Sequence, residues 1–370
     1  MISSAIIPQP LARLPWRLIF LVAGIAGMGI ITLYSAAGGA ANPWAMKQAM
    51  VILFFMCVAI VMSWTSESTI KQVAFPIYIA ITVMLVLVEM LGFVGKGAQR
   101  WLDLGFIRLQ PSEFMKPGIV LVLARFYELL PVGDIRKWRA IWPAAALIGF
   151  PAALIILQPD LGTALMVTFI GVTVMFVAGV PFRVFLIPGA ALAVAIPVVY
   201  QLLHGYQKRR IDTFLDPESD PLGAGYHITQ SKIAIGSGGI FGKGYLQGSQ
   251  SHLDYLPEGH TDFVFATMVE EWGLVGGALL IFAFAFVIRW GMRVANNARS
   301  RFAQLTAAGL SATIFFYVSI NLLMVMGLAP VVGVPLPLVS FGGSAGMTLM
   351  LCLGLLMALE RQQRKTSPLL

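Results

Sequence analysis

Residues 74–94 read AFPIYIAITVMLVLVEMLGFV, an apolar stretch with a single charged residue, Glu89. A helix needs about 20 apolar residues to cross the ~30 Å hydrocarbon core of a bilayer. Further stretches of similar length and composition bring the predicted segments to 16–35, 46–64, 74–94, 113–130, 140–157, 161–179, 183–203, 263–290, 302–327 and 341–359. The sequence therefore predicts an all-α, polytopic integral membrane protein with about ten transmembrane helices.

The composition of the whole chain supports the same class. Of its 370 residues, 58% are hydrophobic and 11% are charged, whereas a soluble domain carries about 25% charged residues. These values exclude a soluble multidomain enzyme, a disordered protein and a collagen-like fibre. An outer-membrane barrel is also excluded, because its strands are short and alternate in polarity, whereas these apolar runs are continuous.

The distribution of Lys and Arg predicts the orientation. The net charge is +8, and basic residues of membrane proteins collect in cytoplasmic loops. Most of the basic residues here flank the membrane segments on one side, so the charge indicates topology and gives no reason to expect nucleic acid. We expect a multi-pass protein of the cytoplasmic (inner) membrane with both termini in the cytoplasm. Residues 1–370 would form a single transmembrane domain, with 95–112 and the long 204–261 loop, between the seventh and eighth helices, facing outward.

One outer segment, residues 96–116, is unusually rich in charge. It reads KGAQRWLDLGFIRLQPSEFMK. Arginine has a planar fork that suits phosphate oxygens, so this segment could form a pocket for an anionic, membrane-borne head group. Alternatively, it could be an interfacial helix with Trp101 at the level of the lipid head groups. Glu113 and Lys116 could form a helix-surface pair or line a polar cavity.

The second polar segment, residues 253–267, reads LDYLPEGHTDFVFAT and leads into the eighth predicted helix. It brings Asp254, Glu258, His260 and Asp262 close together in sequence. Thr261 or Asp262 could cap the helix, since acids favour the N-terminal end of the helix dipole. Alternatively, a carboxylate here could act as a general base at the outer membrane surface, taking a proton from a sugar hydroxyl.

Two further segments predict irregular backbone. Residues 236–248 are rich in glycine and could form a flexible lid or cradle phosphate through backbone amides. Residues 321–344 read NLLMVMGLAPVVGVPLPLVSFGGS, and their three prolines make a continuous helix unfavourable. Irregular backbone at membrane depth must be buried in protein or line a wet cavity.

Together these segments resemble the motifs of the SEDS family (shape, elongation, division and sporulation). The resemblance rests on residues 96–103, 110–116, 256–263 and 321–344, and it extends over nearly the whole chain. It is greatest to members that act in cell elongation. The resemblance implies a peptidoglycan glycosyltransferase that polymerises lipid II into glycan strands on the outer face of the membrane, during elongation and maintenance of rod shape.

The resemblance also implies roles for individual residues. Asp262 matches the family's catalytic acid and would be the general base of an inverting transfer to the 4-hydroxyl of the acceptor sugar. The predicted substrate-binding residues are Arg100, Arg108, Glu113, Lys116, Asp160, Asp254 and His260. A divalent cation, Mg²⁺ or Mn²⁺, would assist, and no organic cofactor is expected. The sequence does not identify ligands for the metal.

The implied partners are lipid II, the growing glycan strand, a class B penicillin-binding protein with transpeptidase activity, other membrane proteins of the elongation complex and membrane lipid. Two alternatives to an enzyme are a lipid II flippase and a structural scaffold. A flippase needs polar groups through the full depth of the membrane, whereas the charged residues outside the inner loops cluster on the outer side. A scaffold gives no reason for Asp262 beside His260.

Overall fold

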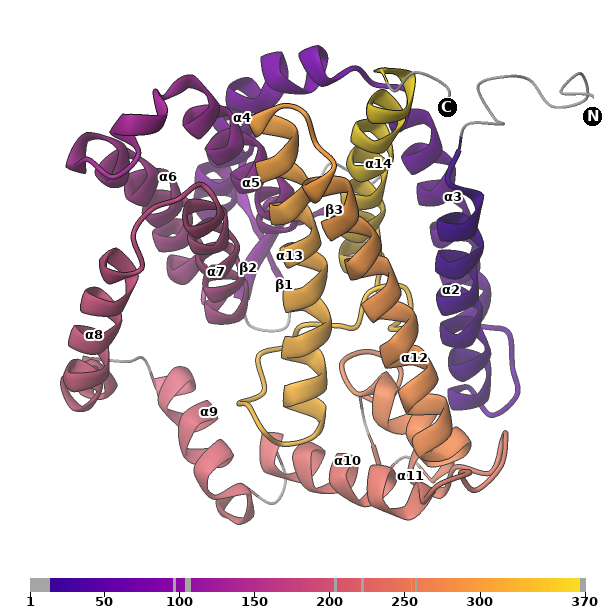
Figure 1. The fold of residues 1–370 in the computed structure, drawn as a ribbon. Coiled ribbons are helices and arrows are strands. Elements are labelled where there is room, and N and C mark those ends of the chain that lie inside the picture. Colours follow the sequence, from indigo (N-terminus) through magenta and orange to yellow (C-terminus); the bar gives the residue numbers. More distant parts are fainter. Residues whose placement is uncertain are drawn as a thin grey trace, which may run out of the picture.

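The computed structural model describes residues 14–95, 98–103, 108–202, 205–220, 223–253, 255–256 and 258–366. Each predicted membrane segment contains a helix (Figure 1). These helices are α2 (Trp16–Ala36), α3 (Ala45–Met62), α4 (Glu67–Leu91), α5 (Pro111–Leu129), α6 (Trp138–Leu157), α7 (Leu161–Val177), α8 (Arg183–Leu202), α12 (Val264–Asn296), α13 (Arg301–Val325) and α14 (Gly343–Thr366). The predicted all-α, polytopic fold is confirmed.

Within the described residues, seven of the helices are long and apolar enough to cross a membrane: α2, α3, α4, α6, α12, α13 and α14. α7 and the start of α8 are apolar but shorter. α5 differs because it carries Glu113, Lys116, Arg125 and Glu128. It packs against α4, α6, α7, α13 and α14, and nearly every side chain from Pro111 to Ala124 is buried. The charges at the start of α5 therefore lie inside the bundle, away from lipid.

Prolines free carbonyl groups within the helices, and at Pro151 a neighbouring helix supplies the missing donor. Pro151 has no N–H, so the Leu147 oxygen in α6 lacks its helical donor; the Tyr78 hydroxyl of α4 donates to it at 2.8 Å. Pro117 likewise frees the Glu113 carbonyl; the Thr348 hydroxyl of α14 lies 3.4 Å from this oxygen but donates over the shorter distance of 3.0 Å to the Glu113 carboxylate. Such compensation is what a proline inside a membrane helix requires.

The 93–109 region forms a small antiparallel sheet in the order β1-β2-β3. Its strands are β1 (Phe93–Gly95), β2 (Ala98–Asp103) and β3 (Arg108–Leu109). The alternative of an interfacial helix was therefore wrong. Gly92 and Gly95, three residues apart, help to explain why, because glycine disfavours a helix. The sheet places Arg100 on β2.

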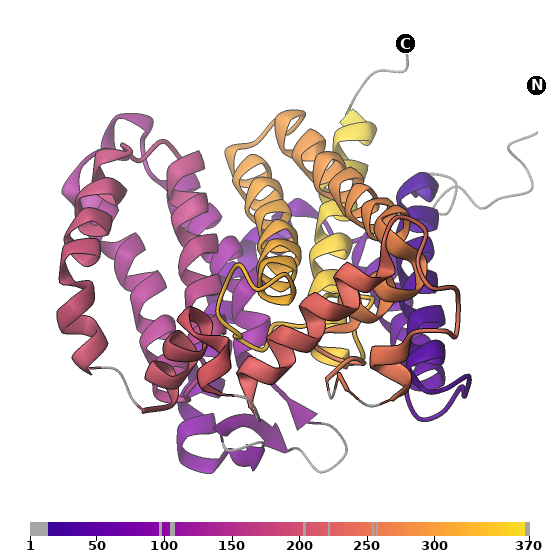
Figure 2. The same ribbon diagram turned by 90° about the horizontal axis from the view of Figure 1, so that it is seen from below.

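The long 204–261 region contains several short helices. They are α9 (Gly205–Leu215), the 3₁₀ turn η2 (Pro217–Ser219), α10 (Ala224–Gly238) and α11 (Ser249–His252). They lie at the end of the bundle where α12 begins (Figure 1), and Figure 2 views the bundle from that end. α2 begins and α14 ends at the opposite end.

α12 is interrupted at Gly273, which has a φ of 66° and a ψ of −167°. Backbone groups of residues 239–244 replace the hydrogen bonds that this break removes. The N–H groups of Leu274 and Val275 donate to the carbonyls of Gly239 and Ile240, at 2.9 and 3.1 Å. In return, the N–H groups of Lys243 and Gly244 donate to the carbonyls of Glu270 and Glu271, at 3.0 and 3.1 Å.

This arrangement corrects both expectations for the glycine-rich segment. The N–H groups of residues 243 and 244 donate to carbonyls of α12, so they do not bind phosphate. Residues 239–244 are hydrogen-bonded to α12 and therefore do not form a flexible lid. The contact is very close: a Cβ on Gly242 would lie 2.0 Å from the Glu271 oxygen. Only glycine fits this position, which also has a positive φ.

The connection between α13 and α14, residues 326–342, is irregular as predicted. It turns at positive φ angles at Gly327, Gly333 and Leu338. Leu338 and Val339 are buried, and the Val339 backbone packs so closely on α2 that a Cβ on Gly29 would lie 2.5 Å from its Cα. Packing against α2 thus holds the connection inside the bundle.

Candidate active site

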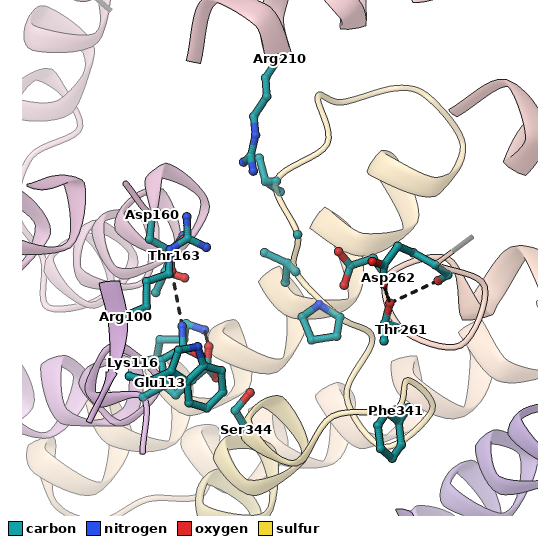
Figure 3. Close-up of a pocket in the computed structure, with 17 residues that line it drawn as sticks. Arg100, Glu113, Lys116, Asp160, Thr163, Arg210, Thr261, Asp262, Phe341 and Ser344 are labelled. Atoms are coloured by element: carbon teal, nitrogen blue, oxygen red, sulfur yellow. Dashed lines mark hydrogen bonds and ion pairs between the residues drawn. The ribbon is translucent and has the colours of Figure 1, made fainter. Parts of the chain in front are cut away.

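A cavity of about 530 Å³ opens between the sheet, the starts of α5 and α7, the turn before α12, α9 and the 326–342 connection (Figure 3). Its described lining comprises Arg100, Trp101, Gln110, Glu113, Lys116, Asp160, Thr163, Arg210, Glu258, Thr261, Asp262, Val332, Gly333, Val334, Pro335, Phe341 and Ser344. The cavity therefore brings together both charged segments that the sequence indicated, together with the proline-rich connection.

Asp262 lies in the turn that precedes α12. The helix begins at Val264 with Phe263 at the N-cap position, so neither Thr261 nor Asp262, the two expected capping residues, occupies that position. The Thr261 hydroxyl instead donates to the Glu258 carboxylate. Gly333 faces Asp262 across the cavity edge, since a Cβ on Gly333 would lie 3.5 Å from Oδ2. The absence of a side chain at Gly333 leaves room beside the carboxylate.

Arg100 is held in place by the connection between α6 and α7. Its Nε donates to the Gln158 carbonyl at 3.2 Å, and another N–H donates to the Pro159 carbonyl. Nε also lies 3.9 Å from Oδ2 of Asp160. Asp160 is fixed in turn, because its Oδ1 caps α7 by accepting from the Thr163 N–H at 3.2 Å. About a quarter of the Arg100 side chain stays exposed, so a fixed guanidinium borders the cavity.

Glu113 and Lys116 form a buried pair at the cavity floor. Lys116 Nζ lies 2.5 Å from Glu113 Oε1 and donates to the Tyr317 hydroxyl at 2.6 Å. The Tyr317 hydroxyl donates to the other Glu113 oxygen, which also accepts from Thr348 at 3.0 Å. Lys116 is 1% exposed. Of the two expectations for this pair, the structure shows the polar cavity and not the helix surface.

The remaining predicted residues are placed differently. His260 does not line the cavity; its ring stacks on Trp44 with centroids 4.0 Å apart, and its carbonyl accepts from the Phe341 N–H at 2.9 Å. The backbone of Arg108 pairs with Asp103 in the sheet, whereas its side chain lies outside the described part. Asp254 also lies outside the described residues.

Arg210 is a cavity residue that the sequence reasoning missed. It lies on α9, at the end of the run Lys208-Arg209-Arg210. A basic run in a long loop is usually a solvated face, and nothing in its spacing separates one arginine from its neighbours. Glu258 was not among the predicted substrate-binding residues, yet it also lines the cavity.

The described residues contain no preformed binding site for the predicted metal ion. No three or more His, Cys, Asp or Glu side chains come close enough there to hold an ion. The four lining carboxylates are instead used separately, for example in the cap of α7 and the Lys116 pair. These residues do not fit a protein-held cation, so the divalent cation stays a prediction and no step below depends on it.

The fold and the cavity define a polytopic membrane protein with a polar site at one end of its bundle. Residues 16–365 match the model of a cell cycle protein family that groups FtsW, RodA and SpoVE, and the chain belongs to this family. The peptidoglycan glycosyltransferase MrdB of Escherichia coli K12 is 47% identical over 292 residues, which cover 79% of this chain and 78% of that protein.

Solved structures agree with this assignment. A chain of a peptidoglycan synthase complex that coordinates polymerisation and crosslinking superposes with a TM-score of 0.82 at 32% identity, covering 95% of this chain and 98% of that one. RodA of Thermus thermophilus gives a TM-score of 0.72 at 30% identity, covering 96% and 98%. The family predicted from the motifs is confirmed.

Proposed function

We propose that this protein is a peptidoglycan glycosyltransferase that polymerises lipid II into glycan strands during cell elongation and maintenance of rod shape. The observation that carries the proposal is that the Asp262 carboxylate and the fixed Arg100 guanidinium line one cavity. A base for the attacking hydroxyl and a cation for the departing phosphate are the two groups that such a transfer needs. The names and activities of the relatives support the same reaction.

The reaction is a single displacement. The 4-hydroxyl of the acceptor's N-acetylglucosamine loses its proton to the Asp262 carboxylate, and its oxygen bonds to the anomeric carbon of the donor's N-acetylmuramic acid. The bond between that carbon and the phosphate oxygen breaks, and its electron pair leaves with the polyprenyl pyrophosphate. Attack from the side opposite the leaving group inverts an α-linked donor into a β-1,4 bond.

The other lining groups supply position and charge. Arg100 and, by the motif resemblance, Arg108 would neutralise the departing pyrophosphate. The Glu113–Lys116 pair forms the floor of the cavity. Asp160 helps to hold the Arg100 side chain in place. Asp254 and His260 were expected to bind substrate; for His260, the stacking on Trp44 favours holding the turn that carries Asp262. A divalent cation, Mg²⁺ or Mn²⁺, would arrive with the pyrophosphate.

The topology completes the proposal. With both termini in the cytoplasm, the end of the bundle that holds α9, α10, α11 and the cavity faces outward, where lipid II presents its sugars. The partner would be a class B penicillin-binding protein, together with other elongation proteins in the inner membrane. The similarity to a peptidoglycan synthase complex supports such a partner.

A lipid II flippase is the alternative, and the cavity gives it less support. The described charged residues that line the cavity come from one end of the bundle: the sheet, the first turns of α5 and α7, and the 204–262 region. A flippase would require a polar route that continues to the opposite end.

Purified full-length protein with fluorescent lipid II separates the two activities. We expect glycan polymers on a gel, and their digestion by a muramidase would verify the product. In a parallel assay, vesicles that contain the protein and a quenchable lipid II analogue would report transbilayer movement. Movement of lipid II without any polymer, in a preparation that is folded and lipid II-bound, would favour the flippase.

A further inference from the structure

Only one residue of the basic run 208–210 lines the cavity. Arg210 is partly buried and extends from α9 toward the cavity, on a different wall from Arg100 (Figure 3). Lys208 is directed elsewhere, because its Nζ donates to the Gln201 carbonyl at 2.9 Å. Arg209 is exposed and is absent from the lining. Of the three basic side chains in this run, only that of Arg210 is positioned by α9 to line the cavity.

The charges that line the cavity restrict where an anionic group can bind. The described lining carries three basic side chains and four carboxylates. Lys116 is 1% exposed and bonded to Glu113 and Tyr317, so its charge is balanced within the protein. Arg100 lies beside Asp160, which offsets part of its charge. With Arg210 included, the four carboxylates still outnumber the three basic side chains, so an anionic group fits best beside the guanidinium groups and away from Asp262 and Glu258.

The displacement reaction itself requires positive charge next to the leaving group. When the bond to the anomeric carbon breaks, the departing pyrophosphate gains about one negative charge, and groups aimed at that developing charge lower the barrier. Arginine suits this role because its planar fork binds two phosphate oxygens at once. A guanidinium that reaches the cavity from a separate wall can contact oxygens that Arg100 leaves unbound.

We infer that Arg210 is a pyrophosphate-binding residue and that, with Arg100, it forms a two-guanidinium site for the leaving group. This inference rests on the proposed function and extends it by assigning the donor's pyrophosphate to the part of the cavity between β2 and α9. Asp262, at the turn before α12, then faces the acceptor sugar. The site thereby acquires a direction, with the donor's phosphates toward α9 and the acceptor toward α12.

The test compares three substitutions of Arg210 with a matched control on the same helix. Arg209→Ala removes the same charge from the adjacent, exposed position. We expect Arg210→Ala and Arg210→Gln to lower kcat/KM for lipid II about tenfold or more, and Arg210→Lys to lose less, because lysine keeps the charge without the fork. Arg209→Ala should stay within about twofold of the unsubstituted protein.

Inorganic pyrophosphate gives a readout that a purely structural role would not change. It should inhibit the unsubstituted protein and the Arg209→Ala variant at similar concentrations, and Arg210→Gln only at a concentration about tenfold higher. If Arg210→Gln matches Arg209→Ala in both kcat/KM and inhibition, the inference is overturned. Should Arg210→Ala not fold, Arg210→Lys and Arg210→Gln decide the question, since the inference requires them to differ from each other.

The outcome for Arg210 is separable from that for the proposed function. If the unsubstituted protein makes no glycan, the proposed function fails. If it makes glycan and Arg210 variants behave like the control, the function stands and only the role of Arg210 is lost.

Discussion

Asn321 and Asp262 are joined by a hydrogen bond from the Asn321 Nδ2 group to the Asp262 main-chain oxygen at 2.9 Å. The same Nδ2 group donates to the Val334 carbonyl at 2.8 Å. Asn321 is fully buried on α13. One side-chain amide therefore holds together the turn that carries the proposed base and the connection that forms the facing wall.

Replacing Asn321 with Ala should destabilise the protein and impair polymerisation. The change removes a donor from the buried Val334 carbonyl and from the partly buried Asp262 carbonyl, and a buried group left unsatisfied costs about 1–3 kcal/mol. Gln304→Ala is the control, because Gln304 is exposed on the same helix. Thermal unfolding in detergent and glycan synthesis are the measurements. An Asn321→Ala protein as stable and active as Gln304→Ala would show that the two Asn321 hydrogen bonds contribute nothing measurable to stability or activity.

Glu113 and Lys116 should be strongly coupled in a double-mutant cycle. Removing one partner of a buried pair leaves an uncompensated charge, at about 3–5 kcal/mol, whereas removing both avoids that penalty. We therefore expect Glu113→Gln and Lys116→Met each to lower the melting temperature sharply, and the double variant to lose less than the sum of both. Additive losses would mean that the two charges are independently solvated.

The break in α12 predicts a position-specific effect of glycine substitution. Gly242→Ala places a Cβ 2.0 Å from the Glu271 oxygen at a positive φ, so it should displace residues 239–244 and destabilise the protein. Gly236→Ala, near the end of α10, meets nothing within 4 Å and should be neutral or slightly stabilising. Melting temperatures of the two variants check this, and equal values would contradict the backbone contact.

Cysteine labelling tests the orientation. Ser237 is exposed on α10, and Asn297 is exposed just after α12, at the other end of the bundle. We expect an impermeant thiol reagent to label Ser237→Cys in intact cells and to label Asn297→Cys only after the cells are opened, because the positive-inside rule places the two ends in different compartments. Labelling in the reverse pattern would invert the topology and place the cavity inside.

The helices were predictable because a membrane span is a local property of about 20 residues. The break at Gly273 was not, since Trp272-Gly273-Leu274 reads as helix interior and its replacement hydrogen bonds come from a segment some thirty residues away in sequence. Asp262 and Arg100 were predicted through the resemblance to family motifs, and both line the cavity. Whether a side chain faces the cavity depends on tertiary packing, which is why Arg210 was missed and why His260, which was expected to bind substrate, stacks on Trp44 and does not line the cavity.

The assignment of Asp262 as the base is tested most directly by Asp262→Asn. Asparagine keeps the size of the side chain and removes its basicity, and because Asp262 is not the N-cap residue of α12, little stability should be lost. We expect glycan synthesis from lipid II by the purified, folded variant to fall by roughly 10²-fold or more, with unchanged melting temperature and membrane insertion. Near-normal synthesis by a folded Asp262→Asn protein would contradict the assignment and direct the search for the base to Glu258.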